Sequence, residues 1–181
     1  MNYNMKKTTL FALLFSFCLI GCHSKKREVT QLINAWKNKE ILLPDSLNFK
    51  VQGRDTLHSN WYFAKYKIVN YIDTTACLSC RNKFYDWSLL QQATDSLNLS
   101  VAYLFIAWTK KYRELEILQQ INCCEIPTLY DTNGQISRLN QFPSHPNFQT
   151  FLLDSLNRVI LIGNPIENPK IRTLYLKTIK P

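Results

Sequence analysis

Two cysteines separated by two residues, Cys77 and Cys80, carry the most reactive chemistry in this 181-residue chain. They follow the apolar run YKIVNYI and stand at the start of a predicted helix. A thiol at a helix N-terminus meets unpaired backbone N–H groups and the positive end of the helix dipole, and both favour the thiolate. Arg81 and Lys83 add positive charge in the first turns. The pair therefore indicates thiol–disulfide exchange or metal ligation.

Two other uses of this pair compete with exchange. A static disulfide suits an oxidising compartment, but so short a loop removes little chain entropy and so stabilises little. A four-thiolate zinc site would have to add Cys123 and Cys124, and adjacent cysteines are awkward as two ligands of one tetrahedral ion. Haem attachment through C-x-x-C-H is excluded, because Arg81 follows the second cysteine. Redox exchange is the favoured interpretation.

The first 22 residues predict export and lipidation. Two lysines precede the apolar run LFALLFSFCLI, which is too short to span a bilayer as a permanent helix. The sequence Leu-Ile-Gly-Cys that ends at Cys22 resembles a bacterial lipobox, in which the cysteine is lipidated and becomes the mature N-terminus. The alternative is ordinary cleavage with an incidental cysteine. We expect a signal peptide at 1–21, a lipid on Cys22, and a cell-envelope protein anchored by that lipid and facing the periplasm.

The charge and glycine content exclude other classes of function. The formal net charge is +9, but the basic residues are spread along the chain, and an exported protein rarely meets nucleic acid. We therefore expect no nucleic-acid partner. With four glycines and no glycine-rich phosphate loop, a nucleotide cofactor is not expected either.

The elements that must position the cysteines follow from hydrophobic periodicity. Helical spacing predicts helices at 29–38, 77–92, 110–120 and 168–179. Apolar or alternating runs predict strands at 66–72, 99–108, 126–130, 148–154 and 158–163, with a further extended segment at 47–57. Asn133-Gly134 marks a turn. Strands that alternate with helices, followed by a hairpin and a last helix, predict a mixed sheet covered by helices.

This order of elements, with C-x-x-C at a strand-to-helix junction, resembles the thioredoxin fold. The text IPTLYDTNGQISRLNQF followed by PSHPNFQTFLLDSLNRVILIGNP is most similar to the membrane-tethered periplasmic branch related to TlpA and ResA. The resemblance covers roughly residues 60–180. It implies an α/β protein with a three-layer α/β/α mixed sheet at 61–181, preceded by a tether at 22–28 and an N-terminal helical and extended addition at 29–60.

The resemblance also implies roles for the cysteines. Cys77 would be the attacking thiol and Cys80 the thiol that resolves the mixed disulfide, with no metal or organic cofactor. Partners would be periplasmic protein thiols or disulfides and a redox partner. The chain departs from the family in having Ala76 where thioredoxins have Trp, and Leu78-Ser79 between the cysteines. A redox-inactive binding module for a protein or envelope component is therefore the alternative.

Thioredoxin-like proteins also carry a cis-proline that faces the disulfide and helps to bind the partner's backbone. Two prolines here are candidates for this substrate-binding loop. Pro127 lies in the local sequence IPT, whereas Pro146 lies in the loop where the TlpA-like branch carries its proline, about two residues early. The Pro146 loop is preferred, because it leaves the final strand–turn–strand–helix pattern intact.

The remaining polar and aromatic residues are given structural roles. Asp73 is read as a strand-end carboxylate facing water rather than as a buried proton acceptor. Cys123 and Cys124 are read as packing residues, at least one of them turned inward, rather than as a further thiol for a disulfide relay. His58 and His145 are expected in loops. The aromatic residues expected in the core and rim of the sheet are Trp61, Tyr62, Phe63, Phe84, Trp87 and Trp108.

Overall fold

A computed structural model describes residues 26–58, 60–73 and 83–180. It divides into two units, 1–36 and 37–181. The described part of the first unit is a helix at 26–36, close to the predicted one, in which the Thr30 hydroxyl donates to the Lys26 carbonyl at 2.9 Å. Cys22, Cys77 and Cys80 lie outside the described residues. In the parts that are described, no helix has both the length and the apolar composition needed to cross a bilayer.

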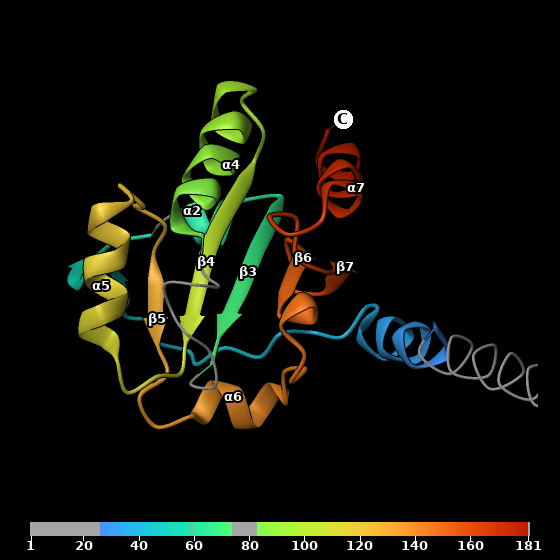
Figure 1. The fold of residues 1–181 in the computed structure, drawn as a ribbon, viewed down its shortest axis with the longest axis horizontal. Helices are drawn as coiled ribbons and strands as arrows, with labels where there is room; N and C mark the ends of the chain where they lie inside the picture. The colour runs from blue at the N-terminus through green and yellow to red at the C-terminus, as the bar shows by residue number, and fades with distance from the viewer. Residues whose placement is uncertain (1–25, 59, 74–82, 181) are drawn as a thin grey trace, which may run out of the picture. The chain divides into compact units, whose positions relative to one another are not determined.

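A seven-stranded mixed sheet forms the centre of the second unit (Figure 1). The strand order is β2-β1-β5-β4-β3-β6-β7, and β3, β4 and β5 run parallel while the outer pairs are antiparallel. The strands are β1 (Phe49–Val51), β2 (Arg54–Thr56), β3 (Tyr66–Ile72), β4 (Val101–Ala107), β5 (Thr128–Tyr130), β6 (Thr150–Asp154) and β7 (Val159–Ile162). The predicted mixed sheet is confirmed.

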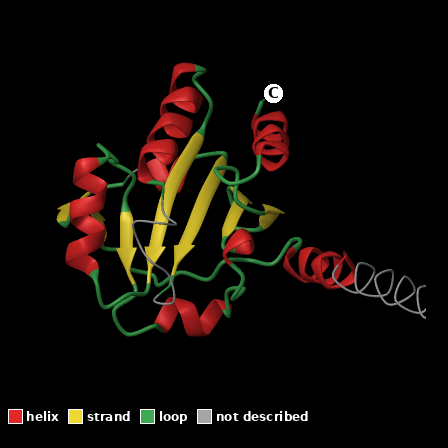
Figure 2. Cartoon of the chain, viewed as in Figure 1, coloured by secondary structure: helices red, strands yellow, loops and turns green. Residues whose placement is uncertain are grey.

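Helices cover both faces of this sheet (Figure 2). The side chains of α4, α5 and α7 share one core cluster with Ile68, Tyr103, Phe105 and Leu152, so these three helices cover one face. The shorter α2 and α6 bring Trp61 and Ile136 to the other face, where Val69 and Leu104 point. These helices are α2 (Asn60–Phe63), α4 (Phe84–Ser96), α5 (Tyr112–Ile121), α6 (Gln135–Asn140) and α7 (Pro169–Ile179). The predicted three layers are present.

Phe105 is the point where the central strand meets the helix that follows the C-x-x-C segment. Its ring packs edge-on against Phe84 at 5.5 Å and Trp87 at 5.8 Å between ring centroids. All three side chains are almost completely buried. Because edge-to-face aromatic pairs contribute beyond their buried area, this cluster holds the start of α4 against the sheet.

The last helix begins as the sequence predicts. The Asn168 side chain accepts hydrogen bonds from the backbone N–H groups of Lys170 at 3.0 Å and Ile171 at 3.4 Å, and Pro169 occupies the first turn. An N-cap side chain satisfies donors that have no partner within the helix, and proline has no N–H to lose there. These two local features place the start of α7.

Two features of the fold differ from the sequence prediction. Helix α6 stands where a turn alone was predicted, because six residues are too few to show a helical period. Its first turn is held by Asp131, whose carboxylate accepts from Ile136 N at 3.0 Å and Ser137 N at 2.8 Å. The segment 47–57, predicted only as extended, forms a hairpin of β1 and β2. This hairpin continues the sheet, because β1 pairs antiparallel with β5.

The partly buried His58 predicts a pH dependence of stability. Its Nε2–H donates to the Tyr103 carbonyl at 3.1 Å, and burial lowers its pKa from the ordinary 6.5, although that hydrogen bond acts the other way. As the pH falls, His58 is therefore protonated in the unfolded chain before it is protonated in the folded protein. We expect the free energy of unfolding to decrease as the pH drops below 6.5 and through the lowered pKa of the folded state.

Urea titrations at several pH values measure this dependence. His58→Gln keeps a neutral side-chain donor and should flatten the profile in this range, whereas the matched change at the exposed His145 should leave it as in the wild type. An unchanged slope in His58→Gln would contradict the assignment.

Candidate functional site

The candidate site lies at the edge of the sheet where β3 ends. Strands β3 and β4 are parallel and in register from Tyr66↔Val101 to Ile72↔Ala107, so their carboxyl ends meet at one edge. This edge is where open α/β sheets bind ligands. The segment from β3 to α4 carries Cys77 and Cys80 and lies outside the described residues. The described residues nearest to it in sequence are Asp73 and Lys83.

Asp73 is buried, which makes the prediction of a water-facing carboxylate wrong. Its exposed fraction is 9%, and Asp73 Oδ2 accepts a hydrogen bond from Gln149 Nε2 at 2.8 Å. The same side-chain nitrogen donates to the Pro143 carbonyl at 3.0 Å, and the backbone carbonyl of Gln149 accepts from the backbone N–H of Tyr71 at 2.8 Å. The chain before β6 therefore folds over the end of β3 and shields the carboxylate from water.

An aromatic wall lies next to this carboxylate. The Tyr71 and Phe142 rings stack with 4.3 Å between centroids, and the Tyr71 hydroxyl lies 2.7 Å from Ser137 Oγ. Burial raises the pKa of Tyr71; its hydrogen bond with Ser137 lowers it, while the charges of Asp73 and Asp131 raise it. Tyr71 is therefore neutral at physiological pH and can serve as a hydrogen-bonding group in this wall.

The two candidate prolines occupy different places. Pro146 opens a short 3-10 turn, Pro146–Phe148, in the chain that brings Gln149 to Asp73. Pro127 is buried directly before β5, and its carbonyl accepts from Phe105 N at 2.9 Å, beside the second half of β4. The described residues contain no cis peptide bond. The structure thus brings the Pro146 loop, and not Pro127, to the end of β3; a substrate-binding role for either proline stays a prediction.

Lys83 marks the other end of the C-x-x-C segment, directly before α4. Its backbone is in the left-handed region, with φ of 27°, and its Nζ lies 3.1 Å from Glu167 Oε1. Both side chains are partly exposed, so this ion pair adds little stability. It does, however, offset part of the positive charge that the sequence suggests for this helix start.

Cys123 and Cys124 behave as the sequence predicts, with one side chain inward. Cys124 is fully buried in the core, where burial raises the pKa of its thiol and so disfavours the reactive thiolate; Cys123 is exposed.

Among residues 26–58, 60–73 and 83–180, no three His, Cys, Asp or Glu side chains are placed to hold a metal ion. The four-cysteine zinc alternative includes Cys77 and Cys80 and lies outside this range.

His58 and His145 lie in loops, as predicted. His145 is exposed, and its Nδ1 accepts from Asn147 N at 3.3 Å, which caps the 3-10 turn. His58 packs edge-on against Phe49 at 5.2 Å between ring centroids. Of the six aromatic residues expected in the core and rim, Trp61, Phe84 and Trp87 are buried; Trp108 is 39% exposed, and Tyr62 and Phe63 are exposed surface residues, so the prediction is wrong for these two.

Sequence reasoning did not find Gln149, Tyr71 and Phe142. Tyr71 belongs to an apolar strand, and Gln149 to a loop that is 76 positions away from Asp73 along the chain. Neither residue type is unusual in its setting. A signal was available only for Tyr71, which stands in the run YKIVNYI that is typical of a strand buried on both faces.

The Gln149–Asp73 contact gives a testable effect on stability. Gln149→Glu removes the amide donor and places a second carboxylate beside a buried one, so we expect the free energy of unfolding to fall by roughly 3 kcal/mol or more. Urea denaturation measures it. The same change at the exposed Gln141 should cost less than about 0.5 kcal/mol. Equal losses in both variants would show that the contact contributes nothing specific.

Comparisons with known proteins support the fold. No protein-family model and no curated protein sequence matches the chain. Among solved structures, it is similar to a Chlorobium tepidum protein assigned as the thiol:disulfide interchange protein DsbE, with 17% identity, a TM-score of 0.59 and coverage of 80% of this chain and 98% of that one. Mycobacterium tuberculosis peroxidoxin BcpB matches with 12% identity, a TM-score of 0.58 and coverage of 80% and 98%.

A third structure is a secreted Mycobacterium tuberculosis disulfide oxidoreductase homologous to Escherichia coli DsbE, with 12% identity, a TM-score of 0.53 and coverage of 72% of this chain and 94% of that one. At these identities the likeness concerns the fold. The chain has a thioredoxin-like α/β fold, as the sequence predicted.

Proposed function

We propose that this protein is a thiol–disulfide oxidoreductase that acts on protein thiols and disulfides through Cys77 and Cys80. The observation that carries the proposal is the place of the C-x-x-C pair, in the segment between β3 and α4 of a thioredoxin-like sheet. Two of the similar structures are described as a thiol:disulfide interchange protein and a disulfide oxidoreductase. The buried Cys124 thiol, with its raised pKa, is the poorer nucleophile.

The proposed chemistry is two successive exchanges. The Cys77 thiolate attacks one sulfur of a partner disulfide; the partner's other sulfur leaves as a thiolate and takes up a proton. Cys80, as thiolate, then attacks the Cys77 sulfur of the mixed disulfide. This step releases the second partner sulfur as a thiol and leaves a Cys77–Cys80 disulfide. Two electrons have passed to the partner, and a separate redox partner restores the dithiol; the same steps in reverse oxidise a partner dithiol.

The described residues at the end of β3 suggest how a partner chain is held. The loop from Phe142 to Gln149 is fixed by its hydrogen bonds to Asp73 and Tyr71 N, so its exposed side can present Pro146 and His145 in a constant position. A fixed loop loses less conformational entropy on binding. In this proposal the Pro146 loop is the surface against which the partner's backbone lies.

The proposed location is the outer face of a bacterial inner membrane or the inner face of an outer membrane, with the domain in the periplasm. Support comes from the signal-like residues 1–21, from Cys22 in its lipobox-like context, and from the description of one similar structure as secreted. A lipid on Cys22 would hold the protein at the membrane through burial of its acyl chains. Labelling with radioactive palmitate, and loss of the label in Cys22→Ala, tests this part separately.

Trapping of a mixed disulfide tests the exchange mechanism. Without the resolving thiol, the full-length Cys80→Ala variant should form a covalent adduct with insulin, visible on non-reducing gels and lost on reduction. The matched Cys77→Ala/Cys80→Ala variant, which keeps Cys123 and Cys124, should form none. An adduct that survives in the double variant, or no adduct in Cys80→Ala, would contradict the proposal and favour the redox-inactive binding module.

A further inference from the structure

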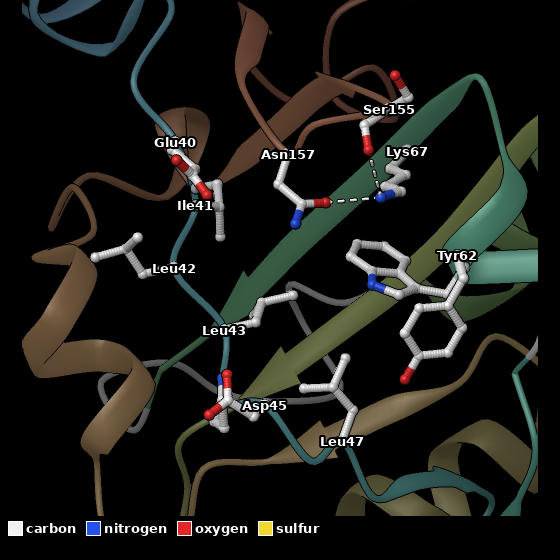
Figure 3. Close-up of a pocket in the computed structure, with 12 residues that line it drawn as sticks. Glu40, Ile41, Leu42, Leu43, Asp45, Leu47, Tyr62, Lys67, Ser155 and Asn157 are labelled. Atoms are coloured by element: carbon white, nitrogen blue, oxygen red, sulfur yellow. Dashed lines mark hydrogen bonds between the residues drawn. The ribbon is translucent and has the colours of Figure 1, made fainter.

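A cavity of about 340 Å³ lies beside Lys67, near the start of β3. It opens between the chain at 40–47, helix α2 and the turn that joins β6 to β7 (Figure 3). Lys67, the second residue of β3, lies at one side of it, with Ser155 and Asn157 beside the ammonium group. Lys67 and Asp73 are six positions apart along β3 and the residue that follows it, so roughly 20 Å separates these two residues.

Lys67 is a buried cation without a paired carboxylate. The residue is 4% exposed, and its Nζ donates hydrogen bonds to the Ser155 carbonyl at 3.0 Å and to Asn157 Oδ1 at 2.8 Å. Nζ also lies 4.9 Å from the centroid of the Trp61 ring, in a cation–π contact. Among the described residues, no carboxylate oxygen comes within 4.0 Å of this nitrogen.

This arrangement favours an anion from outside the chain. Burial lowers the pKa of Lys67, and the charge of Asp154 opposes that shift only from a distance. A buried ammonium costs free energy unless an opposite charge compensates it. An ammonium has three N–H donors, and Ser155 and Asn157 account for two of them. An anionic oxygen that enters the cavity could therefore accept the third while it neutralises the charge.

The rest of the lining limits what kind of anion fits. The lining is mixed: Leu43, Leu47 and Tyr62 add apolar side chains beside the polar groups, and Figure 3 shows these leucine and tyrosine side chains on the side of the cavity below Lys67. The volume suits a small ligand rather than a protein segment.

Two exposed carboxylates, Glu40 and Asp45, stand at the rim. Neither forms an ion pair within 4.0 Å among the described residues. They repel a ligand that carries several negative charges, such as a nucleotide or a polyphosphate, more strongly than a monoanion. The combination of one buried cation, apolar side chains and an acidic rim therefore selects a ligand with a single negative charge.

We propose that this cavity binds a small organic monocarboxylate with an apolar body, whose carboxylate pairs with Lys67. The proposal is independent of thiol–disulfide exchange, because its site and its residues are separate from Cys77 and Cys80. It also gives the buried ammonium an anionic partner, which the described residues do not supply within 4.0 Å.

Calorimetric titration of the full-length protein tests the site, with 4-phenylbutyrate as the probe and the neutral 4-phenylbutanol as its matched control. The carboxylate should bind at least about tenfold more tightly than the alcohol, because a charge-assisted hydrogen bond replaces a neutral one. Lys67→Met should reduce this preference to nearly nothing. Asp45→Asn, at an exposed position, should tighten carboxylate binding by about twofold or threefold, since one repulsive charge is removed.

Other results would overturn the proposal. Equal binding of acid and alcohol, or an unchanged preference in a folded Lys67→Met variant, would leave Lys67 with the purely structural role of joining the β6–β7 turn to β3. No detectable heat with millimolar carboxylate would do the same. If Lys67→Met does not fold by circular dichroism, the acid–alcohol preference of the wild type and its increase in Asp45→Asn decide the question. Both measurements use proteins with Lys67 in place.

Discussion

Replacing Cys77 by alanine should reduce the catalysed reduction of insulin by dithiothreitol to the uncatalysed background, a loss of roughly a hundredfold or more. In the proposed mechanism the Cys77 thiolate forms the bond to the partner sulfur, and the two thiols among the described residues, Cys123 and Cys124, are not expected to replace it. Cys124 is fully buried with a raised pKa, and Cys123 directly follows the C-cap of α5, Asn122, rather than standing at a helix N-terminus. The turbidity that appears when reduced insulin chains precipitate measures the rate.

The controls for this prediction are variants of Cys123 and Cys80. Cys123→Ser changes an exposed side chain and should keep nearly the full rate of insulin reduction. Cys80→Ala should lose multiple turnovers but still form the mixed disulfide described above. Insulin reduction that persists in Cys77→Ala would contradict the mechanism, whatever the other two variants do.

Replacing Phe105 by alanine should lower the free energy of unfolding by roughly 3–5 kcal/mol. Its side chain is 1% exposed in the middle of β4 and packs against Phe84 and Trp87, so its removal leaves a cavity between the sheet and α4. Since domains of this size are stable by only about 5–15 kcal/mol, the loss is a large part of the total. Urea denaturation followed by circular dichroism measures it.

Phe63→Ala is the matched control, because the same side chain is removed at a position that is 84% exposed. It should change the free energy of unfolding by less than about 0.5 kcal/mol. A Phe105→Ala loss below about 1 kcal/mol would mean that the aromatic cluster does not hold α4 to the sheet, since so small a loss is far below the cost of a core cavity. The start of α4 would then need another anchor.

The parts of the fold that the sequence predicted best have a strong local signal. The run YKIVNYI coincides with β3, because a strand buried on both faces is apolar almost throughout. Asn168 and Pro169 place the start of α7 through the chemistry of the first turn. The hairpin of β6 and β7 follows from two apolar runs around Ser155 and Asn157.

The parts that could not be predicted depend on contacts between distant residues. Asp73 looks like a solvated strand end in the sequence, but in the structure it is buried and accepts a hydrogen bond from the Gln149 amide, which arrives from the loop before β6. Helix α6 depends on Asp131, four residues before its first residue, and six residues show no period of their own. Lys67 was hidden in an apolar run; its buried ammonium needs the turn at Ser155 and Asn157, which lies about ninety positions away.

The reduction potential of the Cys77–Cys80 couple tests the central claim most directly. The full-length protein is equilibrated in redox buffers, its thiols are trapped, and the peptide that carries both cysteines is quantified by mass spectrometry. We predict a single two-electron transition with a midpoint between roughly −270 and −120 mV, the range of thiol–disulfide oxidoreductases. A midpoint below about −300 mV, or a pair that glutathione does not reach, would mark a static structural disulfide and contradict the proposed function.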